Sequence, residues 1–109
     1  MIENWREMSD EELAIKITSI GLETGLKYGI LSKINEDGEE KYFLHPAFKD
    51  VFDKHLKMYK LMGYVMDRDK MMEVLIKSVL DYTSFMAEDE LIPLVMVLET
   101  LIGEEDLRI

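Results

Sequence analysis

The spacing of hydrophobic residues changes twice along the chain, and each change marks a boundary between predicted elements. From residue 13 to residue 28, apolar side chains recur at intervals of three and four, as on one face of a helix. Over residues 30–44 they alternate with polar ones around an Asp37-Gly38 turn, which is typical of a β-hairpin. From Pro46 to Ile102 the helical interval returns. The pattern predicts a mainly α fold with a minor β component: about five helices and one β-hairpin.

The first helical segment contains regularly spaced glycines that allow two interpretations. Ser9 stands three residues before Glu12, so the two residues can form a capping box at a helix start. Gly21, Gly25 and Gly29 then recur every four residues. Either Gly21 ends a first helix and residues 22–28 form a short second one, or one helix continues and its glycine face lets another backbone approach closely. We expect a break or kink at Gly21, because glycine within a helix costs about 1 kcal/mol relative to alanine.

The predicted hairpin has an acidic tip. A two-residue turn sets Leu31 opposite Leu44 and also places Glu36 opposite Glu39. Because like charges directly opposite one another are destabilising, a longer loop is the alternative. The tip of this wing-like hairpin comprises Glu36, Asp37, Gly38 and Glu39.

Residues 46–66 are predicted to form an amphipathic helix with one basic face. Pro46 fits the first turn of a helix, where its missing N–H is not needed. This is the only segment with a net positive charge. Its apolar face comprises Phe48, Phe52, Tyr59, Met62 and Met66, and its basic face comprises Lys49, Lys54, Lys57 and Lys60. The four lysines are candidates for phosphate contacts, but the simpler interpretation, which we favour, is that they solvate the outer face of the helix.

Two further helices are predicted towards the C-terminus. The first begins with Asp67-Arg68-Asp69 and is carried by Met71, Leu75, Val79, Tyr82 and Met86. The second opens at Glu88-Asp89-Glu90, is apolar nearly all round over residues 91–102, and is expected to stop at Gly103. A helix that is apolar on every side must be buried on every side, either at the centre of a bundle or in a subunit interface. The predicted partner or dimer interface comprises Leu91, Leu94, Val95, Leu98, Leu101 and Ile102.

Composition narrows the class of protein. A chain of 109 residues is expected to form one domain, with a helix and hairpin portion at 1–45 and a three-helix portion at 46–109. The absence of cysteine excludes disulfides, thiolate metal sites and cysteine nucleophiles. The N-terminal residues do not resemble a signal peptide, and no apolar run is long enough to span a membrane, so a cytoplasmic protein with no membrane partner is expected. Its formal charge of -10 disfavours contact with nucleic acids.

The sequence offers no convincing catalytic or metal-binding group. His55 falls on the apolar face of its helix while Asp50 and Asp53 point elsewhere, so a partly buried, hydrogen-bonded histidine is expected instead of a metal ligand. His45, before a proline, is expected to cap or pack. The carboxylates occur in consecutive runs at turns and helix starts, where solvation and the helix dipole explain them. We expect no catalytic activity, no metal and no cofactor.

Residues 13–45 resemble the second half of a winged-helix domain. A helix ends in Leu26-Lys27-Tyr28-Gly29-Ile30-Leu31, and a hairpin ending in Tyr42-Phe43-Leu44 follows. The resemblance implies that residues 22–28 would read DNA. Two features depart from the family: the residues before the hairpin have room for two helices instead of three, and the candidate recognition helix and wing tip lack its usual basic residues.

These observations favour binding over chemistry. We expect a small, acidic, homodimeric protein-interaction or regulatory module whose partners are another protein and a second copy of the chain. Nucleic acid is less favoured as a partner but stays open. The alternative is a winged-helix DNA-binding transcription regulator in which the four lysines grip phosphates. A further alternative is an inhibitor whose acidic surface imitates nucleic acid.

Overall fold

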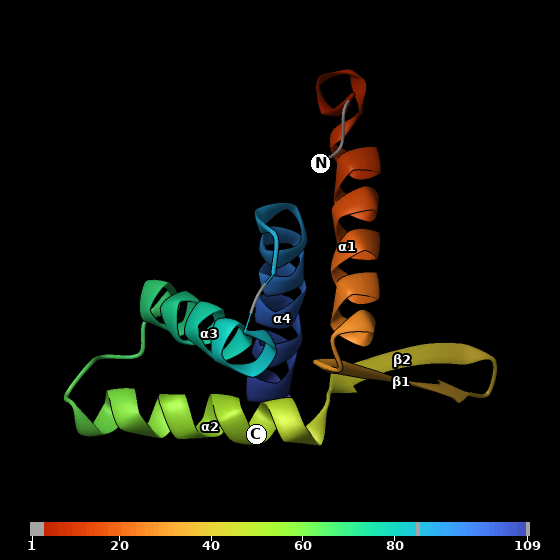
Figure 1. Cartoon of the computed structure of the whole chain (residues 1–109). Coiled ribbons are helices and arrows are strands. Elements are labelled where there is room, and N and C mark those ends of the chain that lie inside the picture. The colour runs from red at the N-terminus through yellow and green to blue at the C-terminus, as the bar shows by residue number, and fades with distance from the viewer. Residues whose placement is uncertain (1–3, 85, 109) are drawn as a thin grey trace.

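The computed structural model describes residues 4–84 and 86–108, and this part of the chain forms four α-helices and one two-stranded antiparallel sheet (Figure 1). A mainly helical fold with a single hairpin is thereby confirmed, although about five helices were predicted. In chain order the elements are the 3-10 helix η1 (Trp5–Glu7), α1 (Asp10–Lys27), β1 (Leu31–Glu36), β2 (Glu39–Leu44), α2 (Pro46–Leu61), α3 (Arg68–Thr83) and α4 (Glu88–Arg108).

Helix α1 begins where the capping box predicts but does not break at Gly21. The Ser9 hydroxyl accepts a hydrogen bond from the backbone N–H of Glu12 at 3.2 Å, and the helix then continues to Lys27. The predicted break is wrong, because Gly21 serves as a point of close contact with α4 and not as a helix end. A Cβ atom at this position would lie 2.5 Å from the Pro93 carbonyl oxygen and 2.6 Å from Val97 Cγ2. The glycine face therefore admits the backbone of α4, as the other interpretation required.

Gly29 ends α1 in a Schellman motif. Its φ of 70° lies in the left-handed region, and the N–H of Ile30 donates to the Gly25 carbonyl at 2.8 Å. The N–H of Gly29 donates to the Leu26 carbonyl at 3.3 Å. One α-helix and η1 thus precede the hairpin, and the resemblance to winged-helix domains stays a prediction.

The hairpin closes with the tight turn. Asp37 and Gly38 have φ values of 54° and 83°, the signs that a two-residue type I′ turn requires. Leu31 pairs with Leu44 and Glu36 with Glu39, so the longer loop does not form. The side chain of Lys41 lies 3.2 Å from that of Glu36 and brings an opposite charge to the like-charged pair.

Helix α2 starts at Pro46 as predicted but ends five residues early. The His45 side chain caps it by accepting a hydrogen bond from the backbone N–H of Ala47 at 3.1 Å. The helix stops at Leu61, and Gly63 with a φ of 88° turns the chain away. The prediction that Met62 belongs to the apolar helix face is therefore wrong: its side chain is exposed in the connection to α3.

The last two helices differ from prediction at their C-terminal ends. Helix α3 starts with a cap from Asp67, which accepts from the backbone N–H of Lys70 at 2.9 Å, and ends at Thr83. Met86 therefore lies beyond α3, although its side chain joins the core. Helix α4 passes through Gly103, so the predicted stop there is wrong; this glycine faces open space and does not interrupt the helix.

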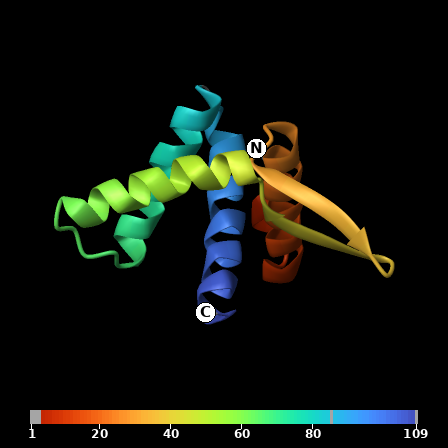
Figure 2. The ribbon, with the colours of Figure 1, turned by 90° about the horizontal axis from the view of Figure 1, so that it is seen from below.

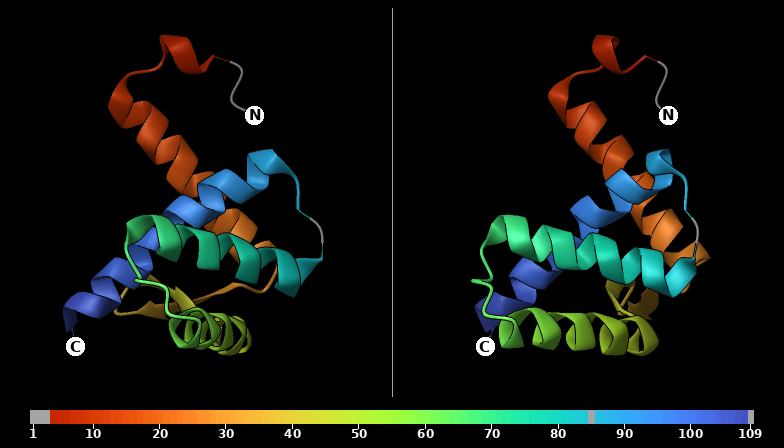
Figure 3. Two further views of the ribbon diagram at one scale, coloured as in Figure 1. Left: turned by 90° about the vertical axis from the view of Figure 1, so that its left-hand side faces the viewer. Right: turned by 60° about the vertical axis from the view of Figure 1, so that its left-hand side comes forward.

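Helix α4 occupies the middle of the molecule, with α1 on one side and α3 on the other (Figure 1). Seen from below, α2 crosses the end of this group while the hairpin projects away from it (Figure 2). Two further views show that α1 and α4 cross (Figure 3). The fully buried core residues Phe48, Leu75, Leu94 and Leu98 come from α2, α3 and α4, so these helices share one core.

Candidate functional site

The residues predicted as an interface on α4 lie mostly inside a single copy of the chain. Leu94 and Leu98 are fully buried, Val95 and Ile102 are nearly so, and Leu91 and Leu101 are partly buried against the core. Burial within one chain is sufficient to explain why α4 is apolar nearly all round. Over residues 88–103 of α4, the large apolar residues that remain exposed are Ile92 and Met96, one turn apart.

The four lysines Lys49, Lys54, Lys57 and Lys60 are all exposed on α2, as predicted. Within the described residues, none of the four forms an ion pair or a side-chain hydrogen bond, whereas Lys27, Lys33, Lys41 and Lys70 each pair with a glutamate. The lysine stripe is therefore a cationic surface that the fold itself does not neutralise.

The hairpin tip also lies where predicted, exposed and away from the helices. Glu36, Asp37, Gly38 and Glu39 are all solvent-exposed. Only the base of the hairpin, at Leu31 and Leu44, enters the core. The tip therefore presents acidic groups to solvent and contributes little to the core.

Residues 22–28, which the winged-helix resemblance assigns to DNA reading, are partly packed against the rest of the chain. Thr24 and Gly25 are buried, and a Cβ atom at Gly25 would overlap the side chain of Leu31. The side chain of Lys27, the only basic residue of this segment, lies 3.1 Å from that of Glu90. This part of α1 is thus committed to contacts with α4 and β1.

That ion pair also receives a tyrosine hydroxyl. Tyr28 Oη donates to Glu90 Oε1 at 3.0 Å, while Lys27 Nζ donates to Oε2 at 3.1 Å. The hydrogen bond from Lys27, followed by that from Tyr28, lowers the pKa of Glu90 below its ordinary value. The same contact raises the pKa of Lys27. Together these groups link the C-terminal end of α1 to the N-terminal end of α4.

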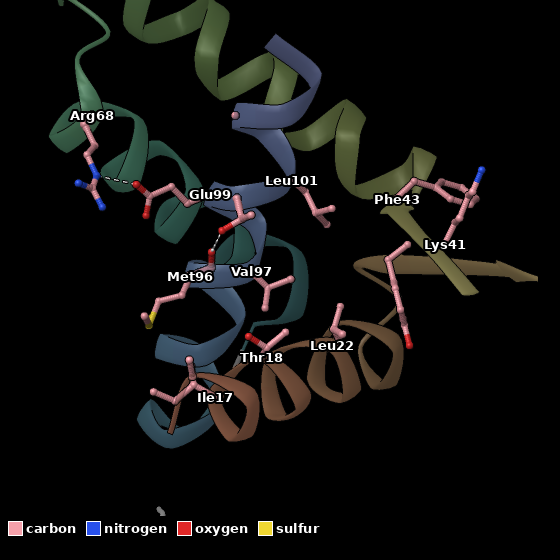
Figure 4. Close-up of a pocket in the computed structure, with 14 residues that line it drawn as sticks. Ile17, Thr18, Leu22, Lys41, Phe43, Arg68, Met96, Val97, Glu99 and Leu101 are labelled. Carbon is pink, nitrogen blue, oxygen red and sulfur yellow. Dashed lines mark hydrogen bonds and ion pairs between the residues drawn. The ribbon is translucent and has the colours of Figure 1, made fainter. Parts of the chain in front are cut away.

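An open groove of about 830 Å³ lies between α1, β2 and α4 (Figure 4). Ile17, Thr18 and Leu22 line it from α1, and Val97 and Leu101 line it from α4. The side of the groove formed by β2 includes Lys41 and Phe43, and an ion pair between Arg68 Nε and Glu99 Oε1 at 2.6 Å lies at its margin. Apolar walls with a few polar groups at the rim are typical of binding clefts.

A second uncovered surface lies where α2 turns into α3, and we call it the turn surface. Leu61 and Val65 are 77% and 79% exposed, the highest values among the large hydrophobic side chains of the described chain. Lys57 and Lys60 stand beside them on the last turns of α2. The turn surface comprises Met58, Leu61, Met62, Tyr64 and Val65, which are all exposed. Exposed apolar clusters of this kind mark interaction sites on soluble proteins.

The turn surface is held in place by aromatic and charged contacts. The rings of Tyr59 and Tyr64 lie 5.3 Å apart, and Lys70 Nζ lies 4.3 Å from the centre of the Tyr64 ring. Lys70 also donates to Glu73 at 3.1 Å, which raises the pKa of the lysine. Because these contacts hold Tyr64 in place, the connection between α2 and α3 that carries the exposed apolar residues has a fixed conformation.

A third uncovered region is residues 10–20 of α1, which we call the arm. None of the buried residues of α1 precedes Gly21. Ile15 is 70% exposed, and Leu13, Ile17 and Ile20 are only partly buried. The arm therefore carries the amphipathic pattern of a packed helix without a full covering from its own chain.

The histidines behave as expected from sequence. His55 Nδ1 lies 3.2 Å from the Ser78 hydroxyl, and Nε2 lies 2.7 Å from Asp81 Oδ2. These contacts join α2 to α3 and confirm a partly buried, hydrogen-bonded histidine. No three metal-ligating side chains of the described residues converge on a common point. None of the described helices combines the length and apolar character needed to cross a bilayer.

Sequence reasoning missed the groove, the turn surface and the arm. The groove is formed by residues from 14 to 103, and no local pattern brings them together. The turn surface had one available signal, because Gly63 interrupts the apolar run over residues 61–66 at a position suited to a left-handed turn. No protein family model, no curated protein and no solved structure matches the chain, so the geometry described above is the basis for the function proposed below.

Proposed function

We propose that this chain is a homodimeric protein-interaction module that acts by binding and not by chemistry. The observation that carries the proposal is the large surface that one copy leaves uncovered. The chain exposes 7657 Å². A monomeric protein of 12.8 kDa exposes about 6,300 Å² on average, so this chain exposes about 1,400 Å² more than expected.

The shape of the molecule supports the same proposal. Its radius of gyration is 14.7 Å, whereas a compact domain of this length has one of about 13 Å. The excess comes from parts that extend beyond the shared core, namely the arm, the hairpin and the turn surface. All three parts carry exposed apolar side chains, which favours their burial in an assembly.

Measuring the mass in solution tests the dimer directly. Sedimentation equilibrium at micromolar concentrations should give twice the chain mass of 12.8 kDa. A stable interface buries about 800 Å² on each partner, which the excess surface can supply. A chain that stays monomeric throughout the micromolar range would overturn the homodimer.

The groove supports a role in binding a segment of another protein. Its apolar walls fit a short run of apolar side chains from a partner, whereas Lys41 and Arg68 at the margin are already paired with Glu36 and Glu99. We expect peptides selected from a random display library to be apolar in the centre and to bind here. Thr18→Trp, which fills the groove, should abolish binding, whereas Lys77→Trp, at an exposed position that does not line the groove, should not. Equal binding to both variants would contradict the groove as the binding site.

A DNA-binding role is the second candidate, and the lysine stripe is the observation that favours it. Four cations that have no carboxylate partner among the described side chains could contact phosphates, and such binding weakens steeply as salt rises. Titration with random duplex DNA in a salt series, comparing wild type with Lys54→Glu/Lys57→Glu, tests this role. Absence of binding by the wild type at low salt would overturn it.

A further inference from the structure

We propose that two copies of the chain join reciprocally, with the arm of each copy packed on the turn surface of the other. The inference rests on the proposed homodimer and specifies its interface. In this arrangement Ile15 of one copy lies against Leu61 and Val65 of the second. The same contact is made a second time, with Ile15 of the second copy against Leu61 and Val65 of the first. An isologous two-fold dimer has this property, since each pair of contacts occurs twice.

The first support is that the arm and the turn surface are both exposed and apolar. Ile15, Leu61 and Val65 are the three most exposed large hydrophobic residues of the described chain. Burying such a side chain removes apolar surface from water, which favours association. A contact between the two surfaces would cover the least protected apolar residues of both.

The second support is that their charges are opposite. Residues 46–66 carry four lysines against Asp50 and Asp53, a net charge of +2, while the rest of the chain carries -12. The arm starts with Asp10, Glu11 and Glu12 and has Lys16 as its only base. Because Lys57 and Lys60 lie beside the turn surface, an acidic apolar helix fits it better than a neutral or basic one.

The third support is geometric. The arm points to one end of the molecule, and the connection between α2 and α3 lies at another, with α4 between them (Figure 1). The two surfaces therefore do not meet within one copy. The arm and the α2–α3 pair form an open angle in this view, and two such shapes can interlock about a two-fold axis.

The excess surface is sufficient for this interface. About 1,400 Å² of additional exposed area per chain exceeds the roughly 800 Å² that each partner of a standard interface buries. Two separate contacts, one at each surface, share this area in each copy. A second copy of the chain thus covers the exposed apolar residues, brings the opposite charge to each surface and has enough area for a stable interface.

Charge exchange tests the contact. Lys57→Glu/Lys60→Glu and Glu11→Lys/Glu12→Lys should each raise the dimer dissociation constant by about tenfold or more, because each places like charges across the interface. Combining all four substitutions should restore dimerisation to within about threefold of wild type. The control is Lys49→Glu/Lys77→Glu, which changes the net charge equally at exposed lysines outside the turn surface and should leave dimerisation unchanged.

The outcomes separate this inference from the proposal on which it rests. A monomeric wild type overturns the homodimer and this interface together. A dimer that resists both charge reversals keeps the homodimer but overturns this interface. Formation of open-ended polymers would overturn the reciprocal dimer. It would also be overturned if the wild type does not self-associate but co-sediments with anionic vesicles, while Lys57→Glu/Lys60→Glu does not co-sediment with them. Circular dichroism of each variant shows whether the fold is intact.

Discussion

The two halves of α1 have similar sequence patterns and opposite environments. In the C-terminal half, Gly21, Thr24 and Gly25 are buried, and the backbone of α4 passes so close to Gly21 that an added Cβ atom would overlap it. In the N-terminal half, the arm, nothing is fully buried and Ile15 faces solvent. The difference teaches that an amphipathic pattern shows which face needs a covering but not which chain supplies it.

The largest expected effect on stability is at the contact between Gly21 and α4. Gly21→Ala should lower the free energy of unfolding by about 2 kcal/mol or more, because the added methyl group meets the carbonyl oxygen of Pro93, which cannot move aside as a side chain can. Chemical denaturation measures the change. Gly103→Ala is the matched control in α4: apart from its chain neighbours and the adjacent helix backbone, no described atom lies within 4 Å of the added group. It should raise stability by about 0.5–1 kcal/mol through helix propensity alone. Equal effects at both positions would contradict the close contact.

A pair of truncations within α1 gives an intermediate effect. Leu26→Ala should lower the free energy of unfolding by roughly 1–2 kcal/mol, since Leu26 packs against the core but is only partly buried. Ile15→Ala should change the stability of the monomer by less than about 0.5 kcal/mol. Denaturation at low protein concentration isolates these effects from dimerisation. A large loss at Ile15 under those conditions would show that the arm is covered within its own chain.

The smallest expected effect concerns the ion pair at the end of α1. The lowered pKa of Glu90 means that its carboxylate form stabilises the fold above the unfolded pKa, near the ordinary value of 4.5. This contribution is lost as the pH falls through the lower pKa of the folded state. Wild type should therefore melt slightly higher than Glu90→Gln at pH 7, and the difference should shrink below pH 4.5 and disappear once the pH is below the lowered pKa of the folded state. The effect is small because Lys27 is largely exposed to solvent. A difference that persists in acid would assign it to packing and not to charge.

The predictions from sequence agree with the structure where a feature depends on residues close together in the chain, and they fail where it depends on residues far apart in the chain. The cap at Ser9, the Asp37-Gly38 turn and the cap at His45 each depend on residues within three positions. The cap at Ser9 was predicted outright, and each of the other two was one of two alternatives that the sequence allowed. The continuation of α1 through Gly21 depends on Pro93, which lies more than seventy residues away, and that prediction failed. The lysine stripe was predicted correctly because it lies on one face of a single helix.

The candidate surfaces follow the same rule. The groove forms only where α1, β2 and α4 lie side by side, so no spacing within the sequence predicts it. The interface predicted on α4 came from a correct observation, an apolar helix that needs a covering on every side. Its covering comes largely from α1 and α3 of the same chain, which only the packed structure could decide.

The sequence by itself determined the start of each α-helix, the presence of one hairpin and the charge contrast between the segment 46–66 and the rest of the chain. These depend on local hydrogen bonds, backbone preferences and composition. Only the tertiary structure decided that α4 is the centre of the molecule, that Gly21 is a contact and not a break, and that the arm and the turn surface remain uncovered. The physical reason is that burial depends on which distant segments meet, and the spacing of apolar residues does not encode that choice.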